Sequence, residues 1–331
     1  MEYYSLNNYL QDIFGKKVYK IAINAGFTCP NRDGRAGYGG CIFCSGDGSG
    51  DFAGDREQGI AAQIEEGCKR IEAKMGNGEP AYIAYFQAFT NTYASVEVLR
   101  EKYMEAVRHP HVVGISIATR PDCLGDDIVK LIGEINLIKP VWIELGLQTI
   151  HDRTVKLINR GYETEVYEAA VKKLVPLGVH IVTHVILGLP GETYEDMLET
   201  VKYVGDISHS YAHSVSCKRA GVTQEDMLLT NVVEKINTEK DSTRNQFGIK
   251  LQLLHVISGT RLADMYDMGE FATLEMDEYV RLVADCLELL PKDMVIHRIT
   301  GDGDKRTLIA PLWSGDKKKV LNALNKEIRN R

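Results

Sequence analysis

The sequence predicts an α/β protein built as an open, partial TIM-like barrel of six strand–helix units. Short apolar runs rich in β-branched residues alternate with stretches of helical periodicity, and this alternation is typical of a parallel sheet with right-handed crossovers. Six units are fewer than the eight that close a barrel of this kind. With 331 residues, 44% of them hydrophobic, the chain can bury the core that such a fold requires.

The strand and helix candidates alternate along the first 260 residues. Six apolar runs are predicted as strands: residues 18–24, 81–87, 113–119, 141–147, 179–187 and 249–257. Five amphipathic stretches are predicted as helices: residues 59–75, 95–108, 126–138, 163–177 and 194–204. The fourth helix shows the pattern clearly, because its apolar residues recur at helical spacing: Val166, Ala170, Leu174 and Leu177.

Two domains are expected, a barrel core at residues 1–260 and a C-terminal α/β extension at residues 261–331 that packs on the core. A polar segment at about residues 209–246 is rich in Ser, Thr, Asn, Lys and Glu. It is longer than most connections in compact domains, and it includes a predicted short helix at residues 224–236. This insertion is interpreted as a lid, a partner-binding arm or a mobile surface loop, with a sequence artefact that has no function as a further alternative.

The formal net charge of the chain is −7, which does not indicate a nucleic-acid-binding protein. The charge is uneven, however, because residues 292–331 carry ten Lys and Arg against five Asp and Glu. This segment therefore has a net charge of +5, and the rest of the chain has −12. The basic segment is either a phosphate-binding surface or a solvated helix face, and the sequence favours the helix face.

The most informative motif is a glycine-rich loop that follows the first predicted strand. It holds Cys29, Cys41 and Cys44 with the spacing C-x11-C-x2-C. In barrels of parallel strands the chemistry gathers at the carboxyl ends of the strands, where this loop begins. Three thiolates on one loop can bind a soft metal centre and leave one coordination position open.

Two other interpretations of these cysteines stay open. A structural zinc site would need a distant fourth ligand, because the next cysteine, Cys68, lies in a predicted helix. A disulfide is less favoured, since the seven cysteines are odd in number and no secretory signal precedes them. No run of about 18 apolar residues occurs, so no membrane span is expected. We therefore expect a cytoplasmic protein with reduced thiols and no membrane partner.

Polar residues cluster where the predicted strands end. Gln87, Thr119 and Gln148 stand at or just beyond strand ends, and Glu144 and His184 lie in the middle or second half of their predicted strands. Because parallel strands end at one face, these side chains are expected to converge on one site. Any one of them is more often structural than catalytic, and His184 is equally well explained as a buried imidazole with satisfied hydrogen bonds.

These motifs resemble the radical S-adenosylmethionine (SAM) superfamily. The cysteine loop, with Phe43 between its last two cysteines, is similar to the cluster-binding loop of that superfamily, and its long first gap resembles the branch of the Elongator catalytic subunit. Five runs are similar to YhcC/YtqA-type radical SAM proteins: residues 25–34, 85–92, 119–124, 144–149 and 297–303. The resemblance extends from about residue 4 to residue 328 and implies a partial barrel of radical SAM type.

The resemblance also implies a set of cofactor contacts. Cys29, Cys41 and Cys44 would ligate three irons of a [4Fe-4S] cluster, and the fourth iron would bind the amino and carboxylate groups of SAM. The expected SAM contacts are Phe43 and Leu189 near the adenine, Gln148 and Arg160 at the ribose and the methionine carboxylate, and Gln87, Thr119 and Glu144 elsewhere on the cofactor. The segment around Gln87 lacks the glycine pair that the family usually has there.

The implied activity is reductive cleavage of SAM to methionine and a 5′-deoxyadenosyl radical, which removes a hydrogen atom from a substrate C–H bond. An electron donor such as flavodoxin or ferredoxin would reduce the cluster. The expected substrate is the wobble-uridine side chain of tRNA. Two alternatives stay open: a radical enzyme that acts on a small metabolite, and an iron–sulfur or zinc protein without catalysis.

Overall fold

The computed structural model describes residues 2–46, 48, 50, 53–72, 79–212, 246–301 and 303–331. These ranges include all six predicted strands. Most of the predicted polar insertion lies outside them, together with Cys217 and the predicted helix at residues 224–236. The described start of that insertion, His209 to Ala212, continues a helix, and its last residue, Gln246, directly precedes a strand.

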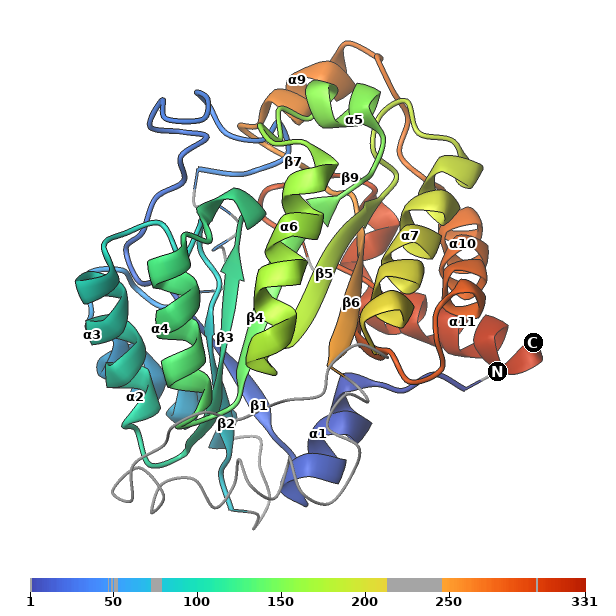
Figure 1. Cartoon of the computed structure of the whole chain (residues 1–331). Helices are drawn as coiled ribbons and strands as arrows, with labels where there is room; N and C mark the ends of the chain where they lie inside the picture. The colour runs from blue at the N-terminus through green and yellow to red at the C-terminus, as the bar shows by residue number, and fades with distance from the viewer. Residues whose placement is uncertain are drawn as a thin grey trace.

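A curved parallel sheet forms the centre of the molecule (Figure 1). Its strands are β1 (Tyr19–Ile23), β2 (Tyr82–Phe86), β3 (Val112–Thr119), β4 (Val141–Gln148), β5 (His180–Leu187), β6 (Phe247–Leu253) and β8 (Val295–Arg298). They lie side by side in that order, and every neighbouring pair is parallel. Because sequence order equals spatial order, the sheet winds in one direction, which confirms the predicted partial barrel.

Most helices cover the outer face of this sheet (Figure 1). These are α2 (Ile60–Glu72), α3 (Val96–Val107), α4 (Asp126–Asn136), α6 (Thr164–Leu174), α7 (Tyr194–Ala212), α10 (Met276–Leu289) and α11 (Lys317–Asn330). Of the others, α1 (Leu6–Phe14) lies at the lower end of the sheet, and α5 (Asp152–Leu157) and α9 (Arg261–Asp267) lie above its upper end. Side-chain caps define several of the starts; Ser5, for example, accepts a hydrogen bond from the Asn8 N–H at the start of α1. No helix in the described part of the chain has both the length and the apolar character needed to cross a membrane.

The C-terminal end of the sheet differs from the expectation in two ways. The predicted strand at residues 249–257 is two strands, because the chain leaves the sheet after Leu253 and then forms β7 (Val256–Ile257), which pairs with β9 (Leu308–Ala310) in an antiparallel ribbon. The extension also supplies β8, a seventh strand beside β6. A strand of four residues with two polar side chains has too weak an alternation to be predicted from sequence.

The interior of the barrel changes from apolar to polar along the strands. At the amino ends of the strands, Tyr9 and Leu10 of α1 pack with Ile83, Trp142 and Val182 in one buried cluster. This cluster closes the end of the barrel at which the strands begin. Further along the strands the inward-facing side chains are polar, so the open space of the barrel lies at the carboxyl ends.

Candidate active site

The cysteine loop begins just beyond the carboxyl end of β1 and is shaped by tight backbone turns. The carbonyl of Cys29 accepts hydrogen bonds from the N–H groups of Arg32 (2.9 Å) and Asp33 (3.3 Å). Gly39 and Gly40 have φ angles of +78° and +79°, a conformation that strongly favours glycine, and they turn the chain back toward the barrel. The loop can therefore return Cys41 and Cys44 to the neighbourhood of Cys29.

Side chains from the loop itself and from the turn after α5 hold this loop in place. Arg32 donates to the carbonyls of Ser45 (2.5 Å) and Gly46 (3.2 Å), which fixes the chain after the last cysteine. Asn159, from the turn after α5, donates to the carbonyl of Gly40 (2.8 Å). The Asn31 side chain donates to the Asn159 carbonyl (2.5 Å) and lies 3.8 Å from the Cys41 sulfur. The thiol positions thus depend on residues far apart in the sequence.

The three cysteines open onto a cavity of about 410 Å³ inside the barrel, a size typical of small-molecule sites. Nine of the ten residues predicted from sequence line it: Cys29, Cys41, Phe43, Cys44, Gln87, Thr119, Glu144, Gln148 and Arg160. The tenth, Leu189, is buried in the apolar cluster at the barrel mouth, where it shares a core with Ile42 and Phe43. Ile186, three residues before Leu189, lines the cavity wall instead.

The side chain of Gln148 fits a cofactor-binding role. Its Oε1 atom is buried and has no hydrogen-bond partner among the described residues. Its backbone has φ +67°, which is uncommon for a residue other than glycine. A buried acceptor without a donor is unfavourable unless a ligand supplies one. The hydroxyl groups of a ribose are donors of the required kind, so this position agrees with a SAM site.

The surroundings of Arg160 differ from those of a residue that grips a ligand. Arg160 is fully buried, and its guanidinium donates to the carbonyls of Leu147 (2.5 Å), Thr149 (2.7 Å) and Tyr162 (3.0 Å). A further N–H reaches the Thr164 hydroxyl (3.3 Å). With four of its five N–H groups used in this way, Arg160 ties the end of β4 to the loop after α5. This geometry favours a positioning role over direct contact with a carboxylate.

Glu144 lies at the centre of a buried charge network. One carboxylate oxygen accepts from Lys20 (2.7 Å) and Ser116 (2.6 Å), and the other accepts from His184 (2.7 Å) and Lys250. Burial alone would raise the pKa of Glu144, but Lys20 and Lys250 hold it well below its ordinary value. Because both oxygens already have partners, Glu144 organises the cavity floor and has little capacity left for the cofactor.

The remaining predicted residues are held less tightly. The Thr119 hydroxyl lies 2.5 Å from the Thr92 hydroxyl, and Thr92 donates to the Cys123 carbonyl. The backbone N–H of Gln87 bonds the Ile23 carbonyl (3.1 Å), which places its side chain in the cavity wall between β1 and β2. Both ring nitrogens of His184 have partners, the Glu144 carboxylate (2.7 Å) and the Gln252 amide (3.2 Å). The interpretation of His184 as a buried imidazole with satisfied hydrogen bonds therefore agrees with the structure.

Sequence reasoning missed the residues that β6 and β8 place in the same cavity. Lys250, Gln252 and Arg298 line its wall, as does Tyr85 from β2. A weak signal was present, because Lys250 and Gln252 alternate with leucines inside an apolar run, which puts both on one face of a strand. Arg298 had no such signal, since β8 itself was not predicted.

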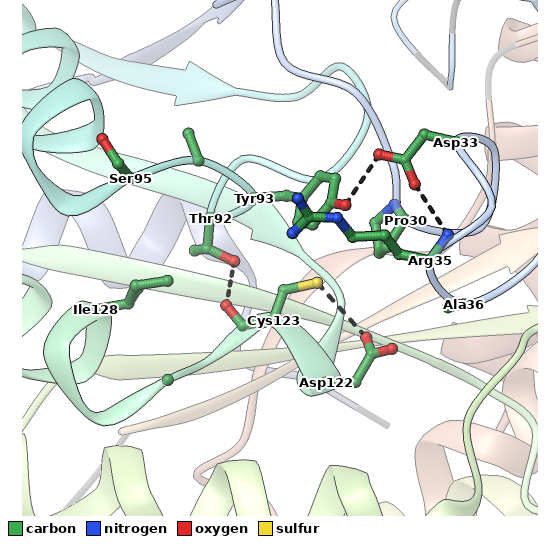
Figure 2. A pocket seen from close by; sticks show the side chains of 12 residues that line it. Pro30, Asp33, Arg35, Ala36, Thr92, Tyr93, Ser95, Asp122, Cys123 and Ile128 are labelled. Atoms are coloured by element: carbon green, nitrogen blue, oxygen red, sulfur yellow. Dashed lines mark hydrogen bonds between the residues drawn. The ribbon is translucent and has the colours of Figure 1, made fainter.

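A second, larger cavity of about 630 Å³ lies against the cysteine loop, which lines it with Asp33 and Arg35 (Figure 2). Asp33 accepts a hydrogen bond from the Tyr93 hydroxyl (2.9 Å), and Arg35 lies over the Tyr93 ring. Asp122 on its other side forms an ion pair with Arg120 (2.7 Å). These charged groups satisfy one another and none of the three loop thiols lines this space. We therefore assign the chemistry to the smaller inner cavity.

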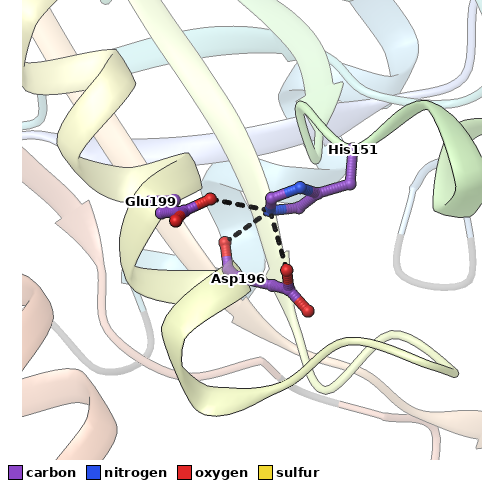
Figure 3. A group of neighbouring side chains, drawn as sticks. All are labelled: His151, Asp196 and Glu199. Atoms are coloured by element: carbon purple, nitrogen blue, oxygen red, sulfur yellow. Dashed lines mark hydrogen bonds and ion pairs between the residues drawn. The ribbon is translucent and has the colours of Figure 1, made fainter.

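One other group of side chains has the composition of a metal site (Figure 3). His151 Nε2 lies 2.8 Å from the backbone carbonyl of Asp196, 3.7 Å from its carboxylate and 4.0 Å from that of Glu199. The Asp196 carboxylate, however, accepts from the Thr193 N–H (2.7 Å), and the Thr193 hydroxyl accepts from the Asp196 N–H. This reciprocal pair is a helix cap at the start of α7, and the histidine stabilises it.

The donor set of the cysteine loop suits an iron–sulfur cluster. Cys29, Cys41 and Cys44 all line the inner cavity, and no fourth cysteine of the described residues lines it. A structural zinc site usually has four protein ligands. Three thiolates with one open position suit a cluster of several irons.

Comparisons with known proteins agree with this site. The profile of the Radical SAM superfamily matches residues 25–204, and that of the Radical_SAM C-terminal domain matches residues 247–330. YtqA of Bacillus subtilis is 44% identical over 329 residues, which cover 99% of this chain and 90% of YtqA. The tRNA uridine(34) acetyltransferase of Methanocaldococcus jannaschii is 24% identical over 319 residues, 85% of this chain and 51% of that protein.

A solved structure shares the fold. Elp3 from Methanocaldococcus infernus superposes with a TM-score of 0.60 at 18% identity, covering 94% of this chain. This chain spans 63% of the Elp3 chain, less than two thirds of its length. At this level of identity the similarity concerns the fold alone.

A partial parallel barrel with three cysteines at the carboxyl ends of its strands defines the class of radical SAM enzymes. The matching profile and the similarity to YtqA show that this chain belongs to the Radical SAM superfamily. It is therefore a radical SAM enzyme, with a [4Fe-4S] cluster and SAM as its cofactors. The domain boundary at residue 260 stays a prediction.

Proposed function

We propose that this radical SAM enzyme modifies the side chain of the wobble uridine of tRNA. The observation that carries the proposal is the similarity to tRNA uridine(34) acetyltransferase, which extends over 85% of this chain. Position 34 is the wobble position, and an anticodon loop is single-stranded, so its base can leave the stack and enter an enzyme cavity. The Elp3-like fold supports the same branch of the superfamily.

In this proposal Cys29, Cys41 and Cys44 hold the cluster, and Gln148 accepts a hydrogen bond from the ribose of SAM. Bound there, the two cofactors supply the one-electron chemistry that generates a 5′-deoxyadenosyl radical and takes hydrogen from a C–H bond. An electron donor such as flavodoxin or ferredoxin reduces the site.

The protein itself positions these groups and limits the access of water to them. Arg160 joins the end of β4 to the loop after α5, and the backbone of Ile42 bonds both that loop, at the Ile158 carbonyl (3.1 Å), and α9, through the Leu262 N–H (3.0 Å). Phe43, Ile186 and leucines at the end of β6 line the cavity mouth with apolar surface. Apolar surface at the mouth limits the access of water to a reactive intermediate.

Mass spectrometry of tRNA nucleosides tests the substrate. Cells without the gene should lose one wobble-uridine derivative and accumulate its precursor, and the wild-type gene should restore the product. A Cys41→Ala gene should not restore it. Cys123→Ala is the matched control, because its half-buried thiol lies outside the loop. An unchanged nucleoside profile in the deletion strain would overturn the tRNA proposal and favour a small-metabolite substrate.

A further inference from the structure

The cavity has a second side that the expected cofactor contacts do not use. Lys250 on β6 is in register with His184 on β5 and with Arg298 on β8. The predicted SAM contacts instead come from β2 to β5 and from the loops that follow β1 and β4. Lys250, Gln252 and Arg298 therefore form a wall of their own within the same cavity.

Apart from the three loop cysteines, the side chains that line this cavity carry more positive than negative charge. Among the described residues that line it, Glu144 is the only carboxylate, and it is shared between Lys250 and Lys20. The guanidinium groups of Arg32 and Arg160 are occupied by backbone carbonyls, whereas Arg120, which also lines the cavity, forms an ion pair with Asp122. These carbonyls are neutral, so they satisfy hydrogen bonds without cancelling charge.

Arg298 differs from the other arginines of the cavity. It is half-buried and lines the wall, and its guanidinium forms no hydrogen bond or ion pair with any residue in the described ranges. Desolvating a guanidinium without a partner is unfavourable. Its planar fork can bind two oxygens of one carboxylate or phosphate at once, which a lysine cannot do. The group therefore has the chemistry of a ligand contact.

The titration of the neighbouring groups agrees with a positive cavity floor. The pKa of Lys250 is lowered to about 7, because burial, reinforced by the positive charges of Lys20 and Arg298, outweighs the opposing effect of Glu144. Burial, followed by the charge of Lys250, lowers the pKa of His184 to about 4, so this imidazole is neutral near pH 7. A bound anion would relieve the repulsion among these cations.

We propose that Arg298 and Lys250 bind an anionic group of the substrate, a carboxylate or a phosphate, on the β6–β8 side of the cavity. Arg298 supplies the two-pronged contact and Lys250 the nearby positive charge, while Gln252 lies beside them as a neutral donor or acceptor. The inference rests on the proposed function only in that the substrate enters this cavity. It holds for a tRNA substrate and for a small metabolite.

Titration of small anions into the reconstituted holoenzyme with SAM tests this site. Acetate and phosphate are compared with chloride at equal ionic strength, and binding is measured by calorimetry and by the unfolding midpoint. We expect one of the two anions to bind, and Arg298→Gln to weaken it at least about tenfold, as expected for a lost charge-assisted hydrogen bond. A preference for acetate identifies a carboxylate, and a preference for phosphate identifies a phosphate.

Two further variants keep the test decisive. Arg261→Gln, which removes an exposed arginine at the start of α9, should bind the anion as the wild type does. Arg298→Lys keeps the charge but loses the planar fork, so its affinity for the anion should lie between those of the wild type and Arg298→Gln. If Arg298→Gln does not fold, Arg298→Lys takes its place in the test. Equal binding by wild type and both Arg298 variants, or no binding beyond chloride, would overturn the proposal.

The affinity for SAM distinguishes this site from the cofactor site. It should be the same in wild type and Arg298→Gln, because the β6–β8 wall is assigned to the substrate. A loss of SAM affinity in Arg298→Gln would show that Arg298 binds the cofactor, and it would refute the assignment of Arg298 to the substrate. None of these measurements involves tRNA, so the failure of the tRNA proposal would not affect them.

Discussion

The two sides of the cavity are built on different principles. On the cysteine-loop side, the side chains of Arg32, Asn159 and Arg160 donate hydrogen bonds to backbone carbonyls. On the β6–β8 side, Lys250 and Arg298 project from neighbouring strands, and no backbone carbonyl in the described residues accepts from their charged groups. A glycine-rich loop has no sheet ladder to order it, so side chains must do so. A strand is already ordered by its neighbours, so the Arg298 guanidinium needs no backbone carbonyl to hold it and faces the cavity, while Lys250 pairs with Glu144.

The largest expected effect is the loss of the cluster on the cysteine-loop side of the cavity. Replacing Cys29, Cys41 or Cys44 with Ala should abolish the cluster, because each would remove one of three thiolate ligands. Anaerobically reconstituted wild-type protein should absorb broadly near ~400 nm and hold about four irons per chain, as a [4Fe-4S] cluster requires. Iron analysis and absorbance of each variant measure the effect.

The other cysteines provide the controls for this experiment. Cys68 and Cys286 are buried in the core between the sheet and the helices, and Cys217 lies outside the described residues, so their replacement by Ala should leave the iron content unchanged. Recovery of zinc alone under anaerobic conditions would contradict the cluster.

A smaller effect is expected from Arg160→Ala, which removes the bridge between β4 and the loop after α5. Three buried carbonyls would lose their donor, at about 1–3 kcal/mol each when left unpaired, so the free energy of unfolding should fall by at least about 3 kcal/mol. SAM binding should weaken by about 1.5–3 kcal/mol, while the cluster survives. Chemical denaturation and SAM titration measure the two quantities.

The pair of results for Arg160 separates two roles. A positioning residue predicts losses of both stability and SAM affinity, whereas direct contact with the SAM carboxylate predicts a loss of affinity at nearly constant stability. Unchanged SAM affinity would show that Arg160 has neither role. Arg153→Ala is the matched control, because this exposed arginine on α5 pairs with Asp196 outside the cavity.

The smallest effect concerns the basic segment, of which Arg298 is the only residue in the cavity wall among those described. Lys317, Lys318 and Lys319 are exposed and form the first turn of α11. Positive charges there oppose the helix dipole, so helix stability does not explain them. If tRNA is bound, changing all three to Gln should weaken binding and flatten its logarithmic salt slope by up to about three units.

Two controls accompany that variant. The unfolding midpoint should stay the same or rise slightly, because the unfavourable charge at the helix start is removed. Cleavage of SAM without substrate should not change. Unaltered tRNA affinity and salt slope would show that the lysines only solvate the helix, which is the interpretation that the sequence favoured.

Local patterns were sufficient to predict the architecture. The strand candidates at residues 81–87 and 141–147 correspond to β2 and β4 within one residue, because apolar runs between turns have a clear period and length. The cysteine loop was equally accessible, since three thiols at fixed spacing after a strand define a metal site without knowledge of the fold. The seventh strand, β8, was missed because four residues carry too little pattern.

The sequence by itself predicted nine of the residues that line the cavity at the carboxyl end of the barrel, because they depend on strand order and on the alternation along each strand, but it missed those of β6 and β8. It did not determine what those residues contact. Arg160 and Arg298 are both arginines near predicted motifs, yet one is buried among carbonyls and the other faces the cavity without a partner in the described chain. Only the tertiary structure decided this, because the partners of a side chain are set by which distant segments pack around it.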